Sequence, residues 1–322
     1  MDFLLAGLGL VILLLAGDAL VRGAVNTSLR LGVPALIVSL TIVAFGTSAP
    51  ELLISVNAVL ADAPGIAIGN VVGSNTANVL MVLGVPALIF GFWTDECDSR
   101  KTYWMMLAAT ALFIALCFFA PLTWWHGLVL LAGLAVMLGD QFRAALNHRR
   151  ADAERTAEAA LTDDVEDLEG ADPSMRWWKI LMFLVLGLIG LPLGADILID
   201  SATEIAQRFG VSDSVIGLTL VAIGTSLPEL ATTVSAAYRK QADVALGNVI
   251  GSNMFNLLAI IGIASLVGEI DVDPAFLRFD LWVMAGASVL LAPFVLLHWS
   301  MGRVWGGALT VLYGGYLWLV VG

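Results

Sequence analysis

The chain has 322 residues, of which 59% are hydrophobic and 13% are charged, and its mean hydropathy is +0.92. Such a composition lies outside the range of water-soluble globular domains and is typical of polytopic membrane proteins. The formal net charge of −12 indicates little about partners, because much of it lies in short connections and in one middle segment. We therefore expect a protein whose main partner is the lipid bilayer, and no binding of nucleic acid.

Apolar segments of about 20 residues, the length that crosses a bilayer, occur ten times along the chain. They cover 3–21, 33–60, 64–90, 102–120, 124–142, 177–199, 213–238, 243–268, 279–298 and 303–321. The first one lacks the basic segment of a secretory signal and continues to Asp18 and Arg22, so we interpret it as a retained span. The predicted fold is an all-α polytopic membrane protein with ten transmembrane helices.

Two copies of one segment lie at a constant spacing of 178 residues (229 − 51). The first copy reads Gly46-Thr47-Ser48-Ala49-Pro50-Glu51 and then Gly69-Asn70-Val71-Val72-Gly73-Ser74-Asn75, with Asn78 beyond; the second reads Gly224-Thr225-Ser226-Leu227-Pro228-Glu229 and then Gly247-Asn248-Val249-Ile250-Gly251-Ser252-Asn253, with Asn256 beyond. Chance does not keep such a register, so the unit is duplicated. Five predicted spans fall in each copy, and an odd number of crossings reverses the second copy relative to the first. We predict two inverted five-helix repeats, at 1–143 and 176–322, joined by a linker at 144–175.

The Lys and Arg residues of the predicted loops indicate the orientation. If the N-terminus faces outward, only Arg208 and Arg278 lie outside, and the other thirteen of the 15 basic residues lie on the cytoplasmic side. Both termini are then outside and the linker is cytoplasmic. The linker starts basic and becomes acidic, but it lacks the pattern of an EF-hand loop, so we interpret it as a solvated connection.

Glu51 and Glu229 lie in the middle of apolar spans that contain no Lys or Arg. An acidic side chain at the centre of a bilayer costs about 2.5 to 3.5 kcal/mol on insertion scales, so a compensating partner is expected. A bound cation would supply it. The alternatives are a pair of protonated glutamates packed for helix association, or a proton relay.

Further oxygen donors lie close to each glutamate in the sequence. Because Pro50 and Pro228 lack an N–H, each helix is expected to break and to turn backbone carbonyls toward a cavity. The candidate donors are the carbonyls from Ala44 to Thr47 and from Ala222 to Thr225, the side chains of Thr47, Ser48, Thr225 and Ser226, and on the next spans Asn70, Ser74, Asn78, Asn248, Ser252 and Asn256. The alternative for the hydroxyls is a bond back to their own helix or between helices.

All these donors are oxygens, which hard cations prefer, Ca²⁺ above all with its six to eight ligands. Two carboxylates would neutralise one Ca²⁺ or two Na⁺. Cys97 and Cys117 have no Cys or His at ligand spacing, so a soft-metal site is disfavoured and no cofactor is expected. The chain lacks the catalytic motif of an intramembrane hydrolase, because neither Ser48 nor Ser226 lies in a nucleophile elbow.

At these residues the chain resembles the Ca²⁺/cation antiporter superfamily, in particular its prokaryotic sodium/calcium exchanger-like members. The GTSxPE and GNxxGSNxxN blocks are similar to the α-1 and α-2 repeats of that family. The resemblance implies a core of spans 2, 3, 7 and 8, with spans 1 and 6 sliding to give alternating access. The resemblance implies that Glu51 and Glu229 bind Ca²⁺ together with the carbonyls of Thr47 and Thr225. It implies flanking Na⁺ sites formed by Ser48, Ser74, Ser226, Ser252 and the carbonyls of Ala44 and Ala222. Asn78 and Asn256 would line the middle of the site.

The function implied is exchange of Ca²⁺ for Na⁺ across the inner membrane of a prokaryote, with both ions as transported substrates. Some relatives, including potassium-dependent exchangers, have Asp where this chain has Asn256, which weakens a role for K⁺. A proton-coupled Ca²⁺ antiporter is the nearest alternative, because the same glutamates could carry protons. A channel is less compatible with inverted repeats and broken helices. The sequence leaves stoichiometry, selectivity among divalent cations and oligomeric state open.

Overall fold

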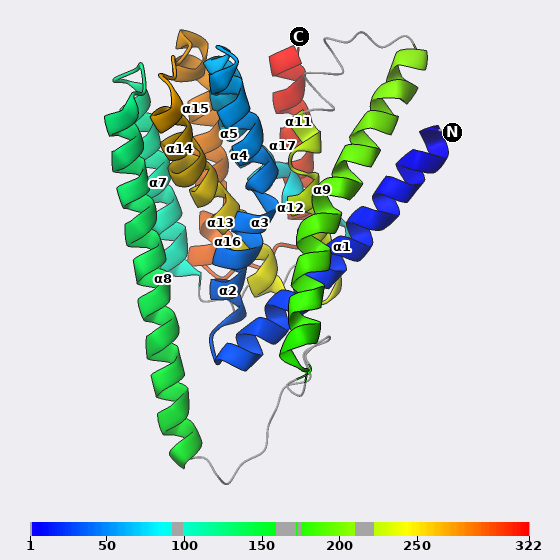
Figure 1. The fold of residues 1–322 in the computed structure, drawn as a ribbon, viewed down its shortest axis with the longest axis vertical. Coiled ribbons are helices and arrows are strands. Elements are labelled where there is room, and N and C mark those ends of the chain that lie inside the picture. Colours follow the sequence, from blue (N-terminus) through cyan, green and yellow to red (C-terminus); the bar gives the residue numbers. More distant parts are fainter. Residues whose placement is uncertain (1, 92–98, 159–171, 173–174, 210–221, 322) are drawn as a thin grey trace.

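The computed structural model describes residues 2–91, 99–158, 172, 175–209 and 222–321, and its regular structure is helical (Figure 1). The N-terminal half contains α1 (Asp2–Leu31), α2 (Ala35–Val38), η1 (Ser39–Val43), α3 (Ala44–Thr47), α4 (Ala49–Leu60), α5 (Pro64–Ala77), η2 (Asn78–Val82), α6 (Gly84–Ile89), α7 (Arg100–Cys117) and α8 (Trp124–Glu158). The C-terminal half contains α9 (Trp177–Arg208), α11 (Ala222–Gly224), α12 (Leu227–Tyr238), α13 (Ala242–Phe255), η4 (Asn256–Ile260), α14 (Ile261–Val267), η5 (Phe276–Asp280), α15 (Leu281–Leu290), α16 (Ala292–Leu296) and α17 (Arg303–Val321). The η segments are short π-helical stretches.

By length and composition, six helical segments in the described part of the chain are long and apolar enough to cross a bilayer: Asp2–Leu31, Pro64–Ile89, Trp124–Asn147, Trp177–Arg208, Ala242–Val267 and Phe276–Leu296. The pair Ala35–Thr47 and Ala49–Leu60, bent by 44°, would be a seventh. The span predicted at 213–238 begins in residues outside the described part. The prediction of an all-α polytopic membrane protein is confirmed.

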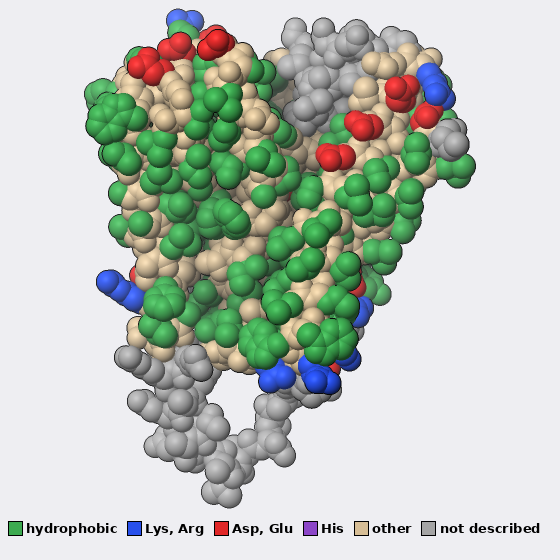
Figure 2. All heavy atoms as spheres, in the orientation of Figure 1, with side chains coloured by type: hydrophobic (Ala, Val, Ile, Leu, Met, Phe, Trp, Pro, Cys, Tyr) green, Lys and Arg blue, Asp and Glu red, His purple; other side chains and the backbone are tan. Residues whose placement is uncertain are grey.

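Charge divides the molecule into two ends. Both termini lie at one end, called here the terminal end, and α8 runs toward the opposite end, called the linker end (Figure 1). Hydrophobic side chains cover the middle of the face shown in Figure 2, with most of its acidic side chains near the terminal end and most of its Lys and Arg near the linker end. An apolar belt between two charged ends is what a bilayer-spanning protein requires.

Helix α8 differs from the prediction, because it continues to Glu158, well into the segment expected to be a linker from 144 onward. The residues beyond 142 are rich in Ala, Arg and Glu, which favour helix even outside the bilayer. Hydropathy identifies the part of a helix that is in lipid and says nothing of a polar extension.

Helices α1 and α9 lie side by side and cross at mirror-related glycines (Figure 1). A Cβ built on Gly9 would lie 2.8 Å from the backbone nitrogen of Leu198, and one built on Gly187 would lie 2.5 Å from the Cβ of Leu20. Both pairs keep the offset of 178, since Gly9 corresponds to Gly187 and Leu20 to Leu198. Small residues allow this close approach, and the crossing lies on the axis that relates the repeats.

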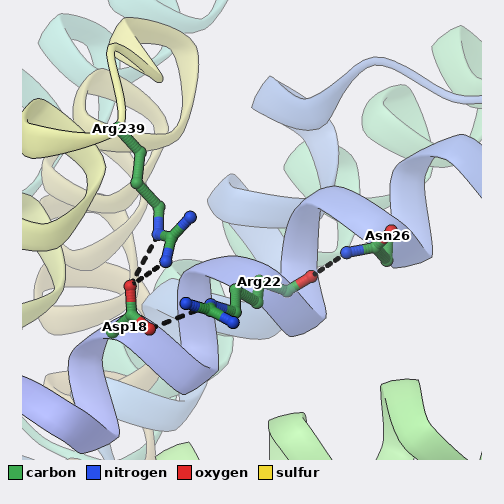
Figure 3. A network of polar contacts seen from close by, with 4 residues as sticks. All are labelled: Asp18, Arg22, Asn26 and Arg239. Carbon is green, nitrogen blue, oxygen red and sulfur yellow. Dashed lines mark hydrogen bonds and ion pairs between the residues drawn. The ribbon is translucent and has the colours of Figure 1, made fainter. Parts of the chain in front are cut away.

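An ion-pair network joins α1 to the end of α12 (Figure 3). Asp18 accepts hydrogen bonds from Arg239, with 2.6 Å between Nε and Oδ1, and it also pairs with Arg22 at 2.9 Å. Arg239 is only 11% exposed in this position. Asn26, one turn beyond Arg22, bonds to the Arg22 carbonyl at 2.8 Å and accepts a bond from the backbone N–H of Asp172. The network therefore fixes α1 to the second repeat.

Helices α5 and α13 form the centre of the molecule. Residues 244–260 of the α13–η4 segment are all buried, and α13 packs on η1, α3, α5, α7 and α12. At equivalent positions both central helices change to π-helix, η2 beginning at Asn78 and η4 at Asn256. A π-helical turn inside an α-helix often marks a functional site, and each of these two begins at an Asn that keeps the offset of 178.

Candidate cation-binding site

Each predicted helix break is present, and the two lie at mirror positions. Ser48 separates α3 from α4 with φ −84° and ψ 4°, and Ser226 precedes α12 with φ −90° and ψ 5°. A proline follows in the first turn of each new helix, where its missing N–H costs nothing. Glu51 and Glu229 are therefore in the first turn of a half-helix, whose N-terminal dipole favours negative charge.

The two glutamates are buried, each only 1% exposed. Glu51 lies three residues after Ser48, and Ser48 contacts the other glutamate. The Ser48 hydroxyl donates to Glu229 Oε1 across the repeats at 3.3 Å. Glu51 Oε2 and Glu229 Oε2 are buried without a hydrogen-bond partner among the described residues. Two carboxylates buried in the same interior are costly unless positive charge compensates them.

One asparagine in each repeat holds the backbone of its glutamate. Asn70 donates to the Glu51 carbonyl at 3.2 Å and to Ser55 Oγ at 3.0 Å. In the second repeat Asn248 donates to the Glu229 carbonyl at 3.3 Å and to the Thr233 hydroxyl at 3.2 Å. Ser55 and Thr233 are also 178 residues apart. These bonds fix α4 to α5 and α12 to α13 beside the carboxylates, so Asn70 and Asn248 position the glutamates.

A reciprocal pair of asparagines lies where the repeats meet. Asn75 Nδ2 donates to the Asn253 carbonyl at 3.2 Å, and Asn253 Nδ2 donates to the Asn75 carbonyl at 3.4 Å. Asn78 Nδ2 adds a bond to Asn253 Oδ1 at 3.0 Å. Identical contacts in both directions are the mark of a two-fold axis, so α5 and α13 contact each other on the axis of the inverted repeat.

Several buried oxygens around this axis have no hydrogen-bond partner within the described residues. Besides the two glutamate oxygens they are Ser74 Oγ, Asn75 Oδ1, Asn78 Oδ1, Ser226 Oγ and Asn256 Oδ1. Buried oxygens are usually satisfied, and an unsatisfied one costs about 1 to 3 kcal/mol. A concentration of them in one region is an arrangement that could coordinate a cation through oxygen.

The predicted donors are brought together to different degrees. Thr47 Oγ1 lies 3.4 Å from Asn248 Oδ1 and 3.5 Å from Ser252 Oγ, so these donors meet across the repeats. The Ala44 carbonyl already accepts bonds from the Ser48 N–H at 3.0 Å and from Thr47 Oγ1 at 3.3 Å, which makes it the least available donor. Ala222 is the first residue of α11 and directly follows the residues outside the described part of the chain.

Sequence reasoning assigned no role to Asn75, Asn253, Ser55 or Thr233. The first two belong to the repeated block, and all four keep the offset of 178. The pattern that could have identified them is a polar residue that recurs at the same offset inside an apolar span. This pattern does not distinguish a residue that faces an ion from one that positions its neighbour.

A cavity of about 470 Å³ reaches the site from the terminal end. Its described lining contains Asn70, Ser74 and Thr225, with Gly69 and Gly73 beside them. The mirror glycines are covered: a Cβ on Gly251 would lie 2.6 Å from that of Ala44, and one on Gly247 would lie 2.9 Å from that of Ser39. By the offset of 178, Ser39 corresponds to position 217, and residues 210–221 lie outside the described part of the chain.

Comparison with known proteins identifies the family. The sequence profile of the family described as Sodium/calcium exchanger protein matches residues 1–142 and 179–322. The chain belongs to the sodium/calcium exchanger family. As a family member it is an integral membrane cation antiporter and not an enzyme, as predicted.

Relatives of this exchanger match it over nearly their whole length. The sodium/calcium exchanger MaX1 of Methanosarcina acetivorans is 34% identical over 345 residues, covering 98% of this chain and 97% of the relative. Inner membrane protein YrbG of Escherichia coli is 32% identical over 317 residues, covering 97% and 94%. A solved structure of the sodium-calcium exchanger NCX_Mj, soaked with zero Na⁺ and Ca²⁺, matches with a TM-score of 0.80 and 31% identity over 99% of this chain and 100% of that one. This exchanger has the NCX_Mj fold.

Proposed function

We propose that the chain exchanges Ca²⁺ for Na⁺ by alternating access, through a site built on Glu51 and Glu229. The remaining ligands of the proposed site are Thr47, Thr225, Ser48, Ser226, Ser74, Ser252, Asn78, Asn256 and the backbone carbonyls of Ala44 and Ala222. The observation that carries the proposal is the pair of buried carboxylates, each with an oxygen that has no hydrogen-bond partner among the described residues.

Charge explains why such a site exchanges one ion species for the other. The two carboxylates supply a charge of −2, which one Ca²⁺ or two Na⁺ neutralise. Without cations the carboxylates repel each other in a low-dielectric interior, so a site that has released one ion is stabilised by binding the other. The neutral hydroxyls and amides complete the six to eight oxygens that Ca²⁺ prefers and discriminate against softer metals.

A cavity that opens toward one end of the described residues supports alternating access. The cavity reaches Ser74 and Thr225 from the terminal end, whereas at the linker end the η1 region packs on α13, where Ser39 Oγ donates to the Val244 carbonyl at 2.6 Å. In an inverted repeat the opposite state follows when the two halves exchange these arrangements. The conformation described here then opens the site toward the terminal end.

The orientation is part of the proposal. Lys and Arg gather at the linker end (Figure 2), as expected for a cytoplasmic side, which would place both termini outside. YrbG, a relative, is described as an inner membrane protein, which supports location in the inner membrane of a prokaryote. The cavity would then open to the extracellular side.

Transport in liposomes tests the proposal. Purified protein is reconstituted in vesicles loaded with Na⁺, and uptake of ⁴⁵Ca²⁺ is measured after dilution into Na⁺-free medium. We expect uptake that requires the outward Na⁺ gradient and stops when Na⁺ is equal on both sides. The same vesicles without Na⁺ but with an outward proton gradient form the second arm. Uptake driven by protons alone would contradict Na⁺ coupling and favour the proton-coupled alternative.

A further inference from the structure

The cavity that reaches the proposed site contains a carboxylate that the site does not use. Its lining includes Asp280 together with Tyr313 and Tyr316, and the same cavity is lined deeper by Ser74 and Thr225. Leu317 and Val320 of α17 complete its outer part. A single continuous space therefore joins Asp280 to two of the proposed ion ligands.

Asp280 is held in place but keeps most of its capacity to bind. It is the last residue of η5 and is partly buried. The Tyr316 hydroxyl donates to Asp280 Oδ1 at 3.0 Å, and the Tyr316 ring stacks on Phe279 with centroids 6.4 Å apart. A carboxylate has about four acceptor positions, so one bond from a tyrosine orients Asp280 without satisfying it.

The first repeat has no charge at the equivalent position. Subtracting 178 from 280 gives Thr102, and the register is secure here, because Trp282 then corresponds to Trp104 and Met284 to Met106. Two hydrogen bonds repeat in the same register. The Thr110 hydroxyl donates to the Met106 carbonyl at 2.9 Å, and the Ser288 hydroxyl donates to the Met284 carbonyl at 3.0 Å. The Thr102 hydroxyl bonds to the Ser99 carbonyl at 2.8 Å. The carboxylate is thus specific to one side of the molecule.

We propose that Asp280 forms an additional cation-binding position in the outer half of the cavity, where cations arriving from the extracellular side are concentrated before they reach Ser74 and Thr225. This inference depends on the proposed function. A single carboxylate between aromatic walls attracts divalent cations more strongly than monovalent ones, because the Coulomb energy is proportional to the charge. A cleft lined by one sign of charge raises the local concentration and the association rate of the opposite ion.

The test is the Ca²⁺ dependence of transport by Asp280→Asn, measured separately with Ca²⁺ on the extracellular and on the cytoplasmic face. On the extracellular face we expect the apparent KM for Ca²⁺ to rise about fivefold to tenfold at low ionic strength, with the maximal rate unchanged. The rise should shrink when choline chloride is added, since salt screens the charge. On the cytoplasmic face the KM should not change.

Three further variants separate charge from structure. Asp280→Glu keeps the charge and should keep a low extracellular KM, and Tyr316→Phe loses the hydrogen bond but keeps the carboxylate, so its KM should stay within about twofold of the wild type. Asp271→Asn removes an exposed carboxylate in the segment 268–275 that does not line the cavity and should have no effect.

Two results would overturn the inference. One is wild-type KM on the extracellular face for Asp280→Asn in vesicles where the wild type exchanges Ca²⁺. The other is an equal loss in Tyr316→Phe and Asp280→Asn, which would make Asp280 a structural partner of Tyr316. A wild-type protein that transports no Ca²⁺ would instead overturn the proposed function, and this inference with it.

Discussion

At the residue scale, the central fact is a carboxylate that is buried and incompletely satisfied. Glu51 is held by its position in the first turn of α4 and by Asn70, which bonds to its backbone carbonyl. Neither of these contacts neutralises the side chain. A glutamine at this position has nearly the same shape and keeps an oxygen, so it isolates the contribution of the charge.

The variant Glu51→Gln should fold but not transport. We expect the Ca²⁺-free protein to be at least as stable as the wild type, because a buried charge without a counterion is removed. Wild-type protein at a Ca²⁺ concentration 100 times its Kd should gain about 2.7 kcal/mol of stability, and the variant should lose most of this gain. Thermal unfolding in detergent with and without Ca²⁺ measures both quantities.

Ser265→Ala provides the matched control. Ser265 is 2% exposed and its hydroxyl donates to the Ile261 carbonyl of its own helix at 2.7 Å. This variant should keep the full Ca²⁺-dependent gain. A normal gain in Glu51→Gln would mean that its charge does not bind the cation.

At the scale of the elements, the inverted repeats share a framework but not their ion pairs. The crossing of α1 and α9 at Gly9 and Gly187 follows the symmetry. The ion-pair network of Asp18 does not follow it. The mirror residue of Asp18 is Asp196, but the mirror position of its partner Arg239 is occupied by Ala61. Helix α1 is therefore joined to α12 by a contact that α9 cannot make with α4.

Removing that contact should loosen α1. In Arg239→Gln we expect Asp18 to lose its best-buried partner, a loss of about 2 kcal/mol for a charge-assisted hydrogen bond. Hydrogen exchange of the backbone amides in the second half of α1 should become faster, and the α9 amides near Asp196 should change much less. Arg22, which is 42% exposed, offers the comparison, since Arg22→Gln should have a smaller effect. Equal exchange in Arg239→Gln and wild type would show that the ion pair does not hold α1.

At the scale of the whole molecule, the architecture could be predicted from the sequence, because the two repeats are related by a single offset of 178 residues. Apolar length predicted an all-α membrane protein, and the 178-residue register predicted the mirror-related helix breaks at Ser48 and Ser226, because a proline in the helix has a defined local effect. The polar extension of α8 to Glu158 was not predicted, since hydropathy is insensitive to helix outside lipid.

The sequence could not reveal contacts that depend on how the halves pack. The bond from Ser48 to Glu229 and the reciprocal pair Asn75 and Asn253 join residues about one repeat apart, and no local pattern specifies such a pairing. A repeat in the sequence predicts what the halves have in common and cannot predict where they differ.

The most direct measurement is an anomalous difference map from crystals soaked in Sr²⁺, a Ca²⁺ substitute with strong anomalous scattering. The proposal predicts a peak between Glu51 and Glu229, with an oxygen of each carboxylate at a coordination distance near the 2.3 to 2.6 Å typical of Ca²⁺. Its occupancy should fall as Na⁺ in the soak is raised. A peak bound by only one of the two glutamates, or by neither, would contradict a shared site contributed by both repeats.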